Sequence, residues 1–518
     1  MRLTDLLSTA GLSCSSEYTD VEITGITCDT RRIREGNLFV ALKGRKTDAH
    51  ALIEEAILRG AAAVLTEEGS EFAENVRSVP ILSCGDTRSA MAYLADAYYG
   101  FPSRELKIVG VTGTNGKTTV ARLLSEILLR DGQKIGLIGT TGAFVGAVAL
   151  NAEGISPDAH MTTPDPEVFY RILAEMRDMG CRMVVMEATS HASALKKLSP
   201  IRFSLLIFTN LTRDHLDFHG TMEAYYDAKA ALFRRTDRAI VNLDGSGVIG
   251  DPVGYGAGIA EEGRRSGAKV TTLSADPKRS ANVSILDVEM HRDAGISFTL
   301  LMQDDEMRIS SPLVGRFNVM NLAEAATAAR MLGVKADTIC TALRSFFEVK
   351  GRMERVTAKS DDISVFIDFA HTPDALENLL FTMRELREKG SRILLLFGCG
   401  GDRDRTKRKE MAQIASRMAD VVYITEDNRR SEDIGQIFSD ILQGMDKEKP
   451  YFLIERREDA IAKAIMDAAP GDIVLLCGKG HEQYTVDQNG THEFFEDKIA
   501  RQALLSRRSD GGGHRDEN

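Results

Sequence analysis

The 518-residue chain lacks paired cysteine motifs and long apolar runs. Its seven cysteines form no C-x-x-C pair, so neither a zinc site nor a disulfide framework is indicated, and a reducing compartment fits best. The N-terminal segment MRLTDLLSTAGLS contains no apolar run of the length that secretion signals have, and no later segment reaches membrane-spanning length. We therefore expect a cytoplasmic protein without membrane insertion.

The chain also lacks the excess of basic residues that a nucleic-acid partner would favour. Lys and Arg number 65 against 76 Asp and Glu, so the net charge is −11 and any anionic substrate must meet local basic sites. With 43% hydrophobic and 27% charged residues, the composition is that of a folded soluble protein. At this length several domains are expected.

The pattern of apolar segments predicts an α/β protein of three domains. Residues 1–105 combine short apolar segments with one helical stretch. Residues 106–340 alternate continuous apolar strands with helices, which predicts a buried parallel sheet, and residues 269–309 show the period-two pattern of a small, half-exposed antiparallel insertion. Residues 341–505 should form a second doubly wound, Rossmann-like sheet. Residues 506–518 are glycine-rich and charged, and we expect them to be disordered.

A glycine-rich segment lies between a predicted strand and a predicted helix. Backbone N–H groups there can surround phosphate oxygens, Lys117 can neutralise them and the Thr118 hydroxyl can ligate Mg²⁺. The segment is not a general Walker motif, because its first glycine would fall on Val111. A tight packing turn is the alternative, but the strand context and the Lys-Thr pair favour nucleotide binding. The predicted ATP-binding residues of this loop are Gly113, Thr114, Asn115, Gly116, Lys117, Thr118 and Thr119.

Polar residues follow two more predicted strands. Glu187 ends one apolar run, and Asp214 and His215 come soon after another. A single polar residue in such a place is more often a cap, but recurrence at successive strand ends indicates a ligand site at the carboxyl edge of the sheet. Lys229, in a helix predicted over residues 222–233, would by composition alone be a solvated lysine.

Several motifs, taken in chain order, resemble those of the Mur ligases. They are G-T-N-G-K-T-T, E-A-T-S-H, F-T-N-L-T-R-D-H-L-D-F-H-G, G-R-F-N-V-x-N, G-R-M-E, I-D-F-A-H-T-P-D, F-G-C-G-G-D-R-D and G-K-G-H-E. The similarity extends from Cys28 to about Arg501. It implies an N-terminal UDP-binding domain, a central ATPase domain, a C-terminal domain that carries the incoming amino acid, and a monomeric protein.

The resemblance implies an ATP-dependent amide ligase of peptidoglycan biosynthesis. The reaction would add meso-diaminopimelate to UDP-N-acetylmuramoyl-L-alanyl-D-glutamate through an acyl phosphate. Lys229 matches the family lysine that CO₂ converts to a carbamate (N6-carboxylysine), an oxygen ligand for Mg²⁺. With ATP and Mg²⁺ as cofactors, the implied catalytic residues are Lys117, Glu187, His215 and Lys229, and the implied metal ligands are Thr118, Glu187, His215 and Lys229.

The same resemblance assigns further binding residues. Adenine and ribose contacts would come from Asn318 and Asn321, with Arg352 and Asp368 closing over the nucleotide. Asn321 could instead be a helix cap and Asp368 a strand-end turn residue. The UDP-sugar residues would be Cys28, Thr30, Arg45, Lys46, Thr47, Thr162, Thr163, Thr189 and Lys197.

Three positions depart from the family pattern around these sites. The usual Gln and Arg after S-H fall on Leu195 and Lys197, and Phe369 replaces the usual Tyr. Leucine cannot form a hydrogen bond and lysine lacks the planar fork of arginine. An altered muramoyl substrate or an inactive nucleotide-binding paralogue is therefore an alternative, which the intact catalytic residues disfavour.

The incoming amino acid would be selected by the C-terminal domain. A distal carboxylate requires a bidentate cation and a distal ammonium requires an acceptor, which the resemblance assigns to Arg430 and Glu482. The diaminopimelate-adding subgroup carries D-N-P-R, whereas this chain has Arg429 in place of the proline. An L-lysine-adding ligase is the nearest functional alternative. The alternative without a function is that Arg429 and Arg430 are solvated surface charges. A folylpolyglutamate synthetase-like ligase is disfavoured by the UDP-site-like residues 28–31. The full predicted set is Arg403, Asp427, Asn428, Arg430, Gly478 and Glu482.

Overall fold

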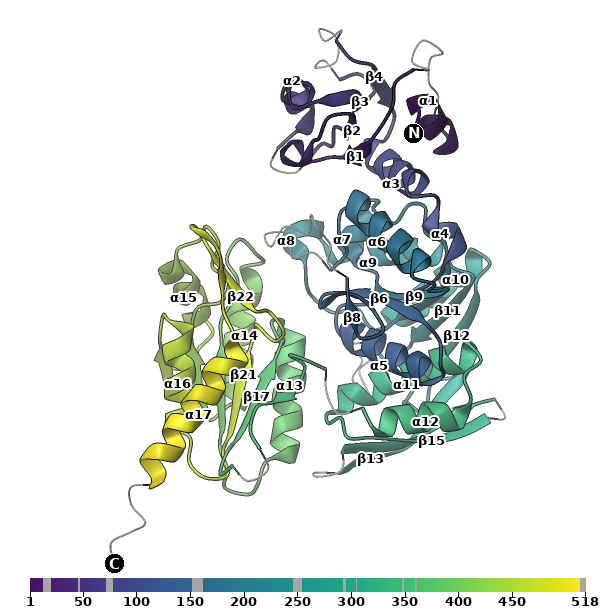
Figure 1. Cartoon of the computed structure of the whole chain (residues 1–518). Helices are drawn as coiled ribbons and strands as arrows, with labels where there is room; N and C mark the ends of the chain where they lie inside the picture. Colours follow the sequence, from purple (N-terminus) through teal and green to yellow (C-terminus); the bar gives the residue numbers. More distant parts are fainter. Residues whose placement is uncertain are drawn as a thin grey trace, which may run out of the picture.

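The computed structural model describes most of the chain as three α/β domains, each built on its own main sheet (Figure 1). The described residues are 1–12, 20–44, 47–70, 78–150, 162–245, 254–291, 295–303, 305–346, 349–358 and 361–512. Arg45 and Lys46, predicted to contact the UDP-sugar, lie outside them. None of the described helices combines the length and the apolar character that crossing a membrane demands.

The N-terminal domain is a parallel sheet in the order β1-β2-β3-β4 with short helices around it. Helix α3 contributes side chains both to the core of this sheet and to the adjoining core of the central domain, so it joins the two domains. The elements are α1 (Leu3–Thr9), β1 (Gly25–Thr27), η2 (Thr30–Arg32), β2 (Asn37–Val40), η3 (Ala49–Leu52), α2 (Ile53–Leu58), β3 (Ala61–Glu67), β4 (Ile81–Cys84), α3 (Thr87–Tyr98) and α4 (Pro102–Glu105).

The central domain is built on a sheet that, among the described residues, has 11 strands in the order β15-β14-β13-β12-β11-β10-β5-β9-β6-β7-β8. Its elements are β5 (Lys107–Thr112), α5 (Lys117–Arg130), β6 (Ile135–Gly139), β7 (Gly142–Val145), β8 (Val148–Ala149), α6 (Pro166–Asp178), β9 (Met183–Glu187), α7 (Ser190–Ala194), β10 (Phe203–Phe208), α8 (Leu216–His219), α9 (Met222–Phe233), β11 (Arg238–Asn242), α10 (Tyr255–Arg265), β12 (Lys269–Ser274), β13 (Val283–His291), β14 (Gly295–Met302), β15 (Asp305–Ser311), α11 (Arg316–Met331) and α12 (Ala336–Arg344).

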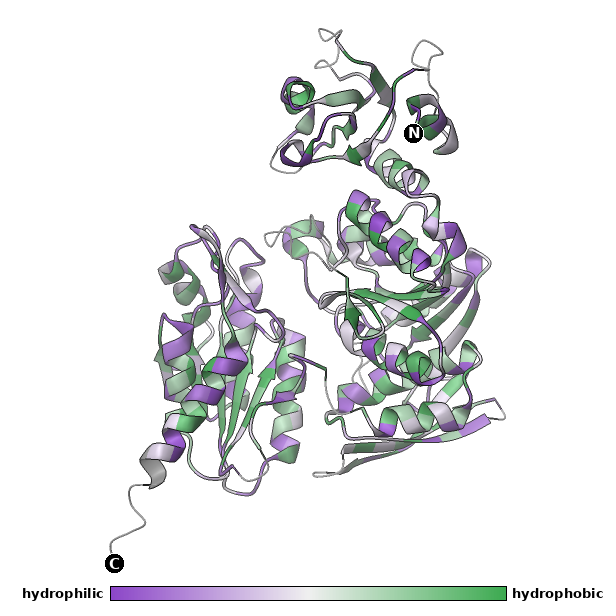
Figure 2. Cartoon of the chain, viewed as in Figure 1, coloured by the Kyte–Doolittle hydropathy of each residue, from purple (hydrophilic) through white to green (hydrophobic). Residues whose placement is uncertain are grey.

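Helices cover both faces of this sheet, which explains why its central strands are continuously apolar. Helices α5, α11 and α12 pack on one face, and α6, α9 and α10 pack on the other. In Figure 2 the strands are correspondingly green, whereas the helices carry purple residues on their outer sides. Because the central strands are parallel, their carboxyl ends meet at one edge of the sheet, where the polar residues predicted as ligands lie.

The predicted antiparallel pairing is confirmed for β13, β14 and β15, but it is wrong for β12 at the start of the segment. Strand β12 pairs in parallel with β11 and with the start of β13, so the antiparallel strands continue the main sheet. The alternating residues Ile296, Phe298 and Leu300 are buried against the helices of the first face. The period-two pattern identified the strands but could not show that their apolar side joins the domain core.

The C-terminal domain contains a sheet in the order β16-β17-β21-β18-β19-β20, parallel except at β16, and a hairpin β22–β23. Residues 506–512 continue helix α17, so the prediction of a disordered tail is wrong for them, and residues 513–518 are not described. The elements are β16 (Glu354–Arg355), β17 (Ser364–Asp368), α13 (Pro373–Leu386), β18 (Ile393–Phe397), α14 (Thr406–Met418), β19 (Val421–Ile424), α15 (Ile434–Leu442), β20 (Tyr451–Leu453), α16 (Arg457–Asp467), β21 (Ile473–Cys477), β22 (Tyr484–Asp487), β23 (Gly490–Glu493) and α17 (Glu496–Gly512).

Candidate active site

The loop between β5 and α5 has the geometry that phosphate binding requires. Gly116 has φ of +86°, and a Cβ there would lie 2.5 Å from Asn321 Oδ1, so the turn needs glycine. The Lys117 Nζ donates to the carbonyl oxygens of Gly113 at 3.0 Å and Thr114 at 2.8 Å, and burial lowers the pKa of this ammonium. The helix N-terminus and a lysine held over the loop can receive phosphate oxygens.

Glu187 lies beside this loop, at the end of β9, and its side chain is 1% exposed. The two carboxylate oxygens accept from the Thr118 hydroxyl at 3.1 and 3.0 Å. They also accept from the backbone N–H of Thr140 at 2.9 Å and from its hydroxyl at 3.0 Å. These bonds fix the carboxylate next to a hydroxyl, and oxygen groups of this kind are the ligands that Mg²⁺ prefers.

Lys229 belongs to the same site, and the interpretation of a solvated lysine is wrong. It lies on α9 with 1% exposure, and its Nζ donates to Gly113 O at 2.8 Å. The Nζ also lies 4.6 Å from the centroid of the Tyr225 ring. Burial, followed by the charge of Lys117, lowers the pKa of Lys229 well below its usual value. The amine therefore has reduced affinity for a proton and points at the phosphate loop.

His215 starts α8 with a left-handed backbone, φ +55°. Its N–H donates to Asp214 at 2.8 Å, and its ring lies 4.6 Å from that of His191. Burial lowers the pKa of His215 well below its usual value, and Lys117 and Lys229 add to this effect. Within the described ranges, no three His, Cys, Asp or Glu side chains converge as they would around a metal ion. A cation here would therefore need the Thr118 hydroxyl and oxygens that a substrate supplies.

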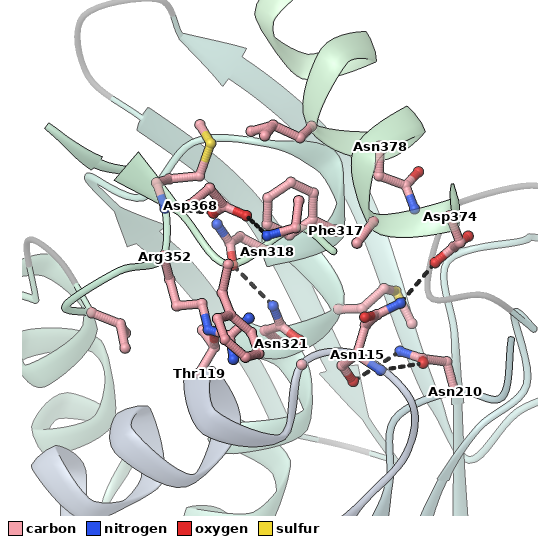
Figure 3. A pocket seen from close by; sticks show the side chains of 18 of the residues that line it. Asn115, Thr119, Asn210, Phe317, Asn318, Asn321, Arg352, Asp368, Asp374 and Asn378 are labelled. Atoms are coloured by element: carbon pink, nitrogen blue, oxygen red, sulfur yellow. Dashed lines mark hydrogen bonds between the residues drawn. The ribbon is translucent and has the colours of Figure 1, made fainter. Parts of the chain in front are cut away.

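A cavity opens between the phosphate loop, α11 and the C-terminal domain (Figure 3). Asn321 lies within α11 and donates to Asn318 Oδ1 at 2.9 Å, so the helix-cap alternative for Asn321 is wrong. Asp368 ends β17 and accepts the N–H of Met353 at 2.7 Å, so it is both a strand-end turn residue and part of the cavity wall. The predicted nucleotide residues that line the cavity are Asn115, Gly116, Thr119, Asn318, Asn321, Arg352 and Asp368.

Arg352 reaches from the C-terminal domain to the central domain. Its Nη2 donates to the Thr118 hydroxyl at 3.4 Å, and its guanidinium carbon lies 4.5 Å from the centroid of the Phe369 ring. A phenylalanine at this position therefore still supports the arginine by a cation–π contact. A second link joins the Asn115 amide of the phosphate loop to Asp374 Oδ2 at 2.8 Å. Figure 3 shows Asp374 on its helix, facing Asn115.

The predicted UDP-sugar residues fall on both sides of the boundary between the first two domains. Thr163 donates to the carbonyl of Glu187 at 3.3 Å and lies 3.4 Å from the Thr189 hydroxyl. The buried Lys197 Nζ lies 2.8 Å from Oδ1 of Asp165, whose side chain is 34% exposed. Thr162 lies beside Thr140, Cys28 and Thr30 belong to the N-terminal domain, and Thr47 is exposed.

The predicted amino-acid residues converge in the C-terminal domain. Arg430 has φ of +53°, and its Nη1 donates to Gly401 O at 2.9 Å. The Asn428 amide donates to Glu482 Oε2 at 2.8 Å. Asp427 neighbours Gly478, where a Cβ would lie 2.9 Å from the Asp427 carboxylate. Arg403 extends toward the central domain, with Nη1 at 3.9 Å from Asp217.

Comparison with known proteins identifies the family. Three models match in chain order: "Mur ligase family, catalytic domain" at residues 22–99, "Mur ligase middle domain" at 111–329 and "Mur ligase, glutamate ligase domain" at 351–480. The chain is 39% identical over 515 residues to the UDP-N-acetylmuramoyl-L-alanyl-D-glutamate--2,6-diaminopimelate ligase of Gloeobacter violaceus, covering 99% of each chain. The chain belongs to the Mur ligase family.

Further relatives support this membership along the whole chain. The enzyme of the same name from Geobacillus thermodenitrificans is 39% identical over 497 residues, with 94% of this chain and 96% of the relative covered. A solved structure of an enzyme with that name has a TM-score of 0.66 at 30% identity, over 98% of this chain and 99% of its own. As a Mur ligase, the protein is an ATP-dependent ligase that forms an amide bond.

Some residues of this Mur ligase site were missed by the sequence analysis. Asp374 and Lys479 lie inside the quoted motifs I-D-F-A-H-T-P-D and G-K-G-H-E, so motif membership was a signal that could have found them. Asp165 and Glu167 gave no such signal. Burial, followed by the charge of Asp165, raises the pKa of Glu167 to about 7, and Glu167 lies 3.8 Å from the Cys28 sulfur. These carboxylates are brought to the substrate residues only by the fold.

Proposed function

We propose that this Mur ligase joins meso-diaminopimelate to UDP-N-acetylmuramoyl-L-alanyl-D-glutamate and converts ATP to ADP and phosphate. The observation that carries the proposal is the convergence of Thr118, Glu187 and Lys229 on the phosphate loop. The relatives that match nearly the whole chain bear the name of this reaction. The product is a peptidoglycan precursor.

The chemistry proceeds in two steps. The D-glutamate γ-carboxylate attacks the γ-phosphorus of ATP, which gives an acyl phosphate and ADP. The neutral diaminopimelate amine then attacks the acyl carbonyl and loses one proton, and phosphate leaves with the electrons of the C–O bond and takes up that proton. Lys117 and Arg352, whose Nη2 lies 3.4 Å from the Thr118 hydroxyl, lower the repulsion between the attacking carboxylate and the nucleotide.

The site fits Mg²⁺ as a cofactor. The Thr118 hydroxyl and the Glu187 carboxylate are hard oxygen donors held 3.0 Å apart, and His215 lies at the same end of the site. Bound there, Mg²⁺ would supply charge neutralisation for the phosphoryl group. The protein side chains hold these donors in place before substrates arrive.

Lys229 is proposed to carry a carbamate derived from CO₂. A carbamate forms when a neutral amine attacks CO₂ and releases a proton, and the lowered pKa of Lys229 increases the neutral fraction. The modification would place an anionic oxygen group where the Nζ now meets Gly113 O at 2.8 Å. One residue would then change from a cation to a metal ligand.

The UDP-muramoyl-dipeptide is proposed to bind across the first two domains. Thr30 and Thr47 would hold the UDP part, with Arg45 and Lys46 from outside the described residues. Thr163 and Thr189 would meet the muramoyl-peptide part. Lys197 stands where the family has arginine, and it is already paired with Asp165 at 2.8 Å, so the substrate must share this cation. We place the domain boundaries near residues 105 and 340.

The diaminopimelate pocket is proposed to use Arg430 for the distal carboxylate and Glu482 for the distal ammonium. Arg429, the residue that replaces proline, lies 3.7 Å from Asp487 of the hairpin and 3.6 Å from Glu455. It therefore points away from the Gly401 carbonyl that Arg430 contacts, which favours an intact clamp. Arg403, Asn428 and Gly478 complete the pocket. The protein is proposed to act as a cytoplasmic monomer.

Phosphate release tests this function. Purified protein is supplied with MgATP and the UDP-muramoyl-dipeptide, and meso-diaminopimelate is compared with L-lysine. Faster release with diaminopimelate is expected. Preference for L-lysine would show that Arg429 has rebuilt the pocket. Precursor binding without turnover would indicate an inactive paralogue, and turnover with a folate substrate alone would indicate the folylpolyglutamate reaction.

A further inference from the structure

Lys479 lies at the centre of the amino-acid pocket, and the proposed mechanism gives it no role. It follows β21, and its side chain is 1% exposed. The Nζ donates to Asn428 Oδ1 at 2.8 Å, to the carbonyl of Tyr484 at 2.9 Å and to Asp427 Oδ1 at 3.3 Å. A buried lysine with three directed bonds is tied to one geometry.

The first consequence concerns the direction of the Asn428 amide. Its Oδ1 faces the Lys479 Nζ and also the backbone N–H of Val486 at 3.0 Å. Both neighbours can only donate, so the amide must present its oxygen to them. The Asn428 NH₂ group is thereby turned toward Glu482 Oε2, at 2.8 Å. Lys479 and the Val486 N–H together therefore determine which end of the amide faces the pocket.

The second consequence concerns charge. The Lys479 Nζ lies 3.3 Å from Asp427 Oδ1 and 3.9 Å from Glu482 Oε2, so one ammonium serves two carboxylates. The nearby Arg457 is itself paired with Glu496 at 2.7 Å. Burial and the charge of Asp427 raise the pKa of Glu482. Burial would also raise the pKa of Asp427, but Lys479 and Arg457 hold it at about 2.

Of the two carboxylates, Glu482 is the less compensated by positive charge. Asp427 has the shorter ion pair with the ammonium, whereas Glu482 accepts from the neutral Asn428 amide and from the Tyr484 hydroxyl at 3.1 Å. An added cation is stabilised most where a buried carboxylate is least compensated. The pocket is thus prepared for an ammonium at Glu482 with a carboxylate beside it, near Arg430.

We propose that Lys479 is a positioning residue that sets the preference for diaminopimelate over L-lysine. It acts through Asn428, whose NH₂ group it helps to hold toward Glu482, and through Asp427, whose charge it neutralises. This inference rests on the proposed function and assigns the discrimination to a side chain outside the binding set. Without the Lys479 ammonium, the carboxylates of Asp427 and Glu482 would repel the distal carboxylate of diaminopimelate. L-lysine has no carboxylate at this position.

The test is K479M, assayed with both amino acids by phosphate release. We expect kcat/KM for meso-diaminopimelate to fall about 10- to 100-fold through KM, because a charged hydrogen bond and its orientation are lost. The loss for L-lysine should be smaller, so the ratio of the two kcat/KM values narrows about tenfold or more. The KM values for ATP and precursor should not change. K479R retains donors and charge and should restore part of the ratio.

The control is K463M, the same substitution at a lysine that is 40% exposed on α16 and paired with Asp467 at 2.9 Å. It should leave both kcat/KM values unchanged. An equal loss with both amino acids in K479M would leave the ratio of the two kcat/KM values unchanged. This result would reduce Lys479 to a structural role and overturn the proposal.

Trapping the acyl phosphate with hydroxylamine in the absence of amino acid separates this inference from the proposed function. K479M should form the trapped product at the wild-type rate. A wild-type protein that forms none would refute the function itself. If K479M is not folded, K479Q removes the charge but keeps a donor for Asn428. The ratio of the kcat/KM values of K479Q for the two amino acids should still narrow, and an unchanged ratio would again overturn the proposal.

Discussion

At the scale of single residues, Lys229 combines burial with a hydrogen bond to the phosphate loop. Its amine is 1% exposed, and burial and Lys117 lower its pKa well below 10.5. In the unfolded chain the same amine keeps its ordinary pKa, so at neutral pH the unfolded state binds more protons than the folded state. Folding stability therefore rises with pH until the unfolded amine titrates, and the destabilisation by Lys229 is largest at low pH.

We predict that Lys229→Met raises the thermal midpoint although it removes activity. The increase should be on the order of a few degrees at pH 7 and should shrink toward pH 10, where the unfolded lysine also loses its proton. Thermal unfolding in CO₂-free, Mg²⁺-free buffer at both pH values measures it. A midpoint that falls at pH 7 would contradict the destabilising role of the buried amine.

The proposed carbamate leads to a second prediction at this residue. If Lys229 carries it, Lys229→Ala should lower phosphate release at least about 100-fold, because an oxygen ligand beside the phosphates would be lost. Formate or acetate should restore part of the rate by occupying the vacated space. The Lys463→Ala variant, changed far from the site on α16, should neither lose activity nor respond to these acids. Absence of any rescue would count against the carbamate.

At the scale of elements, the phosphate loop and helix α13 are linked across the cavity by the bond from Asn115 to Asp374, 2.8 Å. We predict that Asp374→Ala lowers kcat about tenfold, because the loss of this bond loosens the contact between the phosphate loop and α13. Asp374→Asn keeps an oxygen acceptor at the same place and should lose less. Steady-state assays with saturating substrates provide the comparison, and equal losses in the two variants would show that the bond itself is unimportant.

At the scale of the whole molecule, the proposed nucleotide site does not include the N-terminal domain, whereas the proposed precursor site does. The residues that line the cavity come from the central and C-terminal domains. A chain that begins at Asp86 keeps helix α3, whose Ala92 and Ala95 pack in the central core. We predict that it binds ADP within about twofold of the full chain but no longer binds the UDP-precursor. Calorimetric titration measures both, and retained precursor binding would move that site out of the N-terminal domain.

The features that were predicted correctly from the sequence are those that a pattern of neighbouring residues determines. The phosphate loop, the strand that ends at Glu187 and the helix over residues 222–233 were all found from consecutive residues. Contacts between distant segments could not be found in this way, and for Lys229 only the family resemblance indicated a place at the phosphate loop. Lys229 meets Gly113, which lies 116 positions away, and Asn115 meets Asp374, which lies 259 away. No pattern of spacing within a helix shows that its lysine will face a loop of another element.

The same limit explains the errors at the antiparallel strands and at the C-terminus. Alternating residues identified strands near residue 296, but the pairing of β12 with β11 that joins them to the main sheet depends on the folded chain. Residues 506–512 are polar and glycine-containing, yet Arg507 binds Asp362 at 2.8 Å and keeps the helix on the domain. The composition of the segment cannot predict an ion pair with a residue as distant in the chain as Asp362.

The cavity between two domains has a kinetic consequence for inhibitors. Its walls include Asn321 on one domain and Asp368 on the other, so a compound that fills it gains its full set of contacts only when the domains are together. Such a compound should leave faster when the walls separate. Its residence time, more than its association rate, should therefore report how often the enzyme opens.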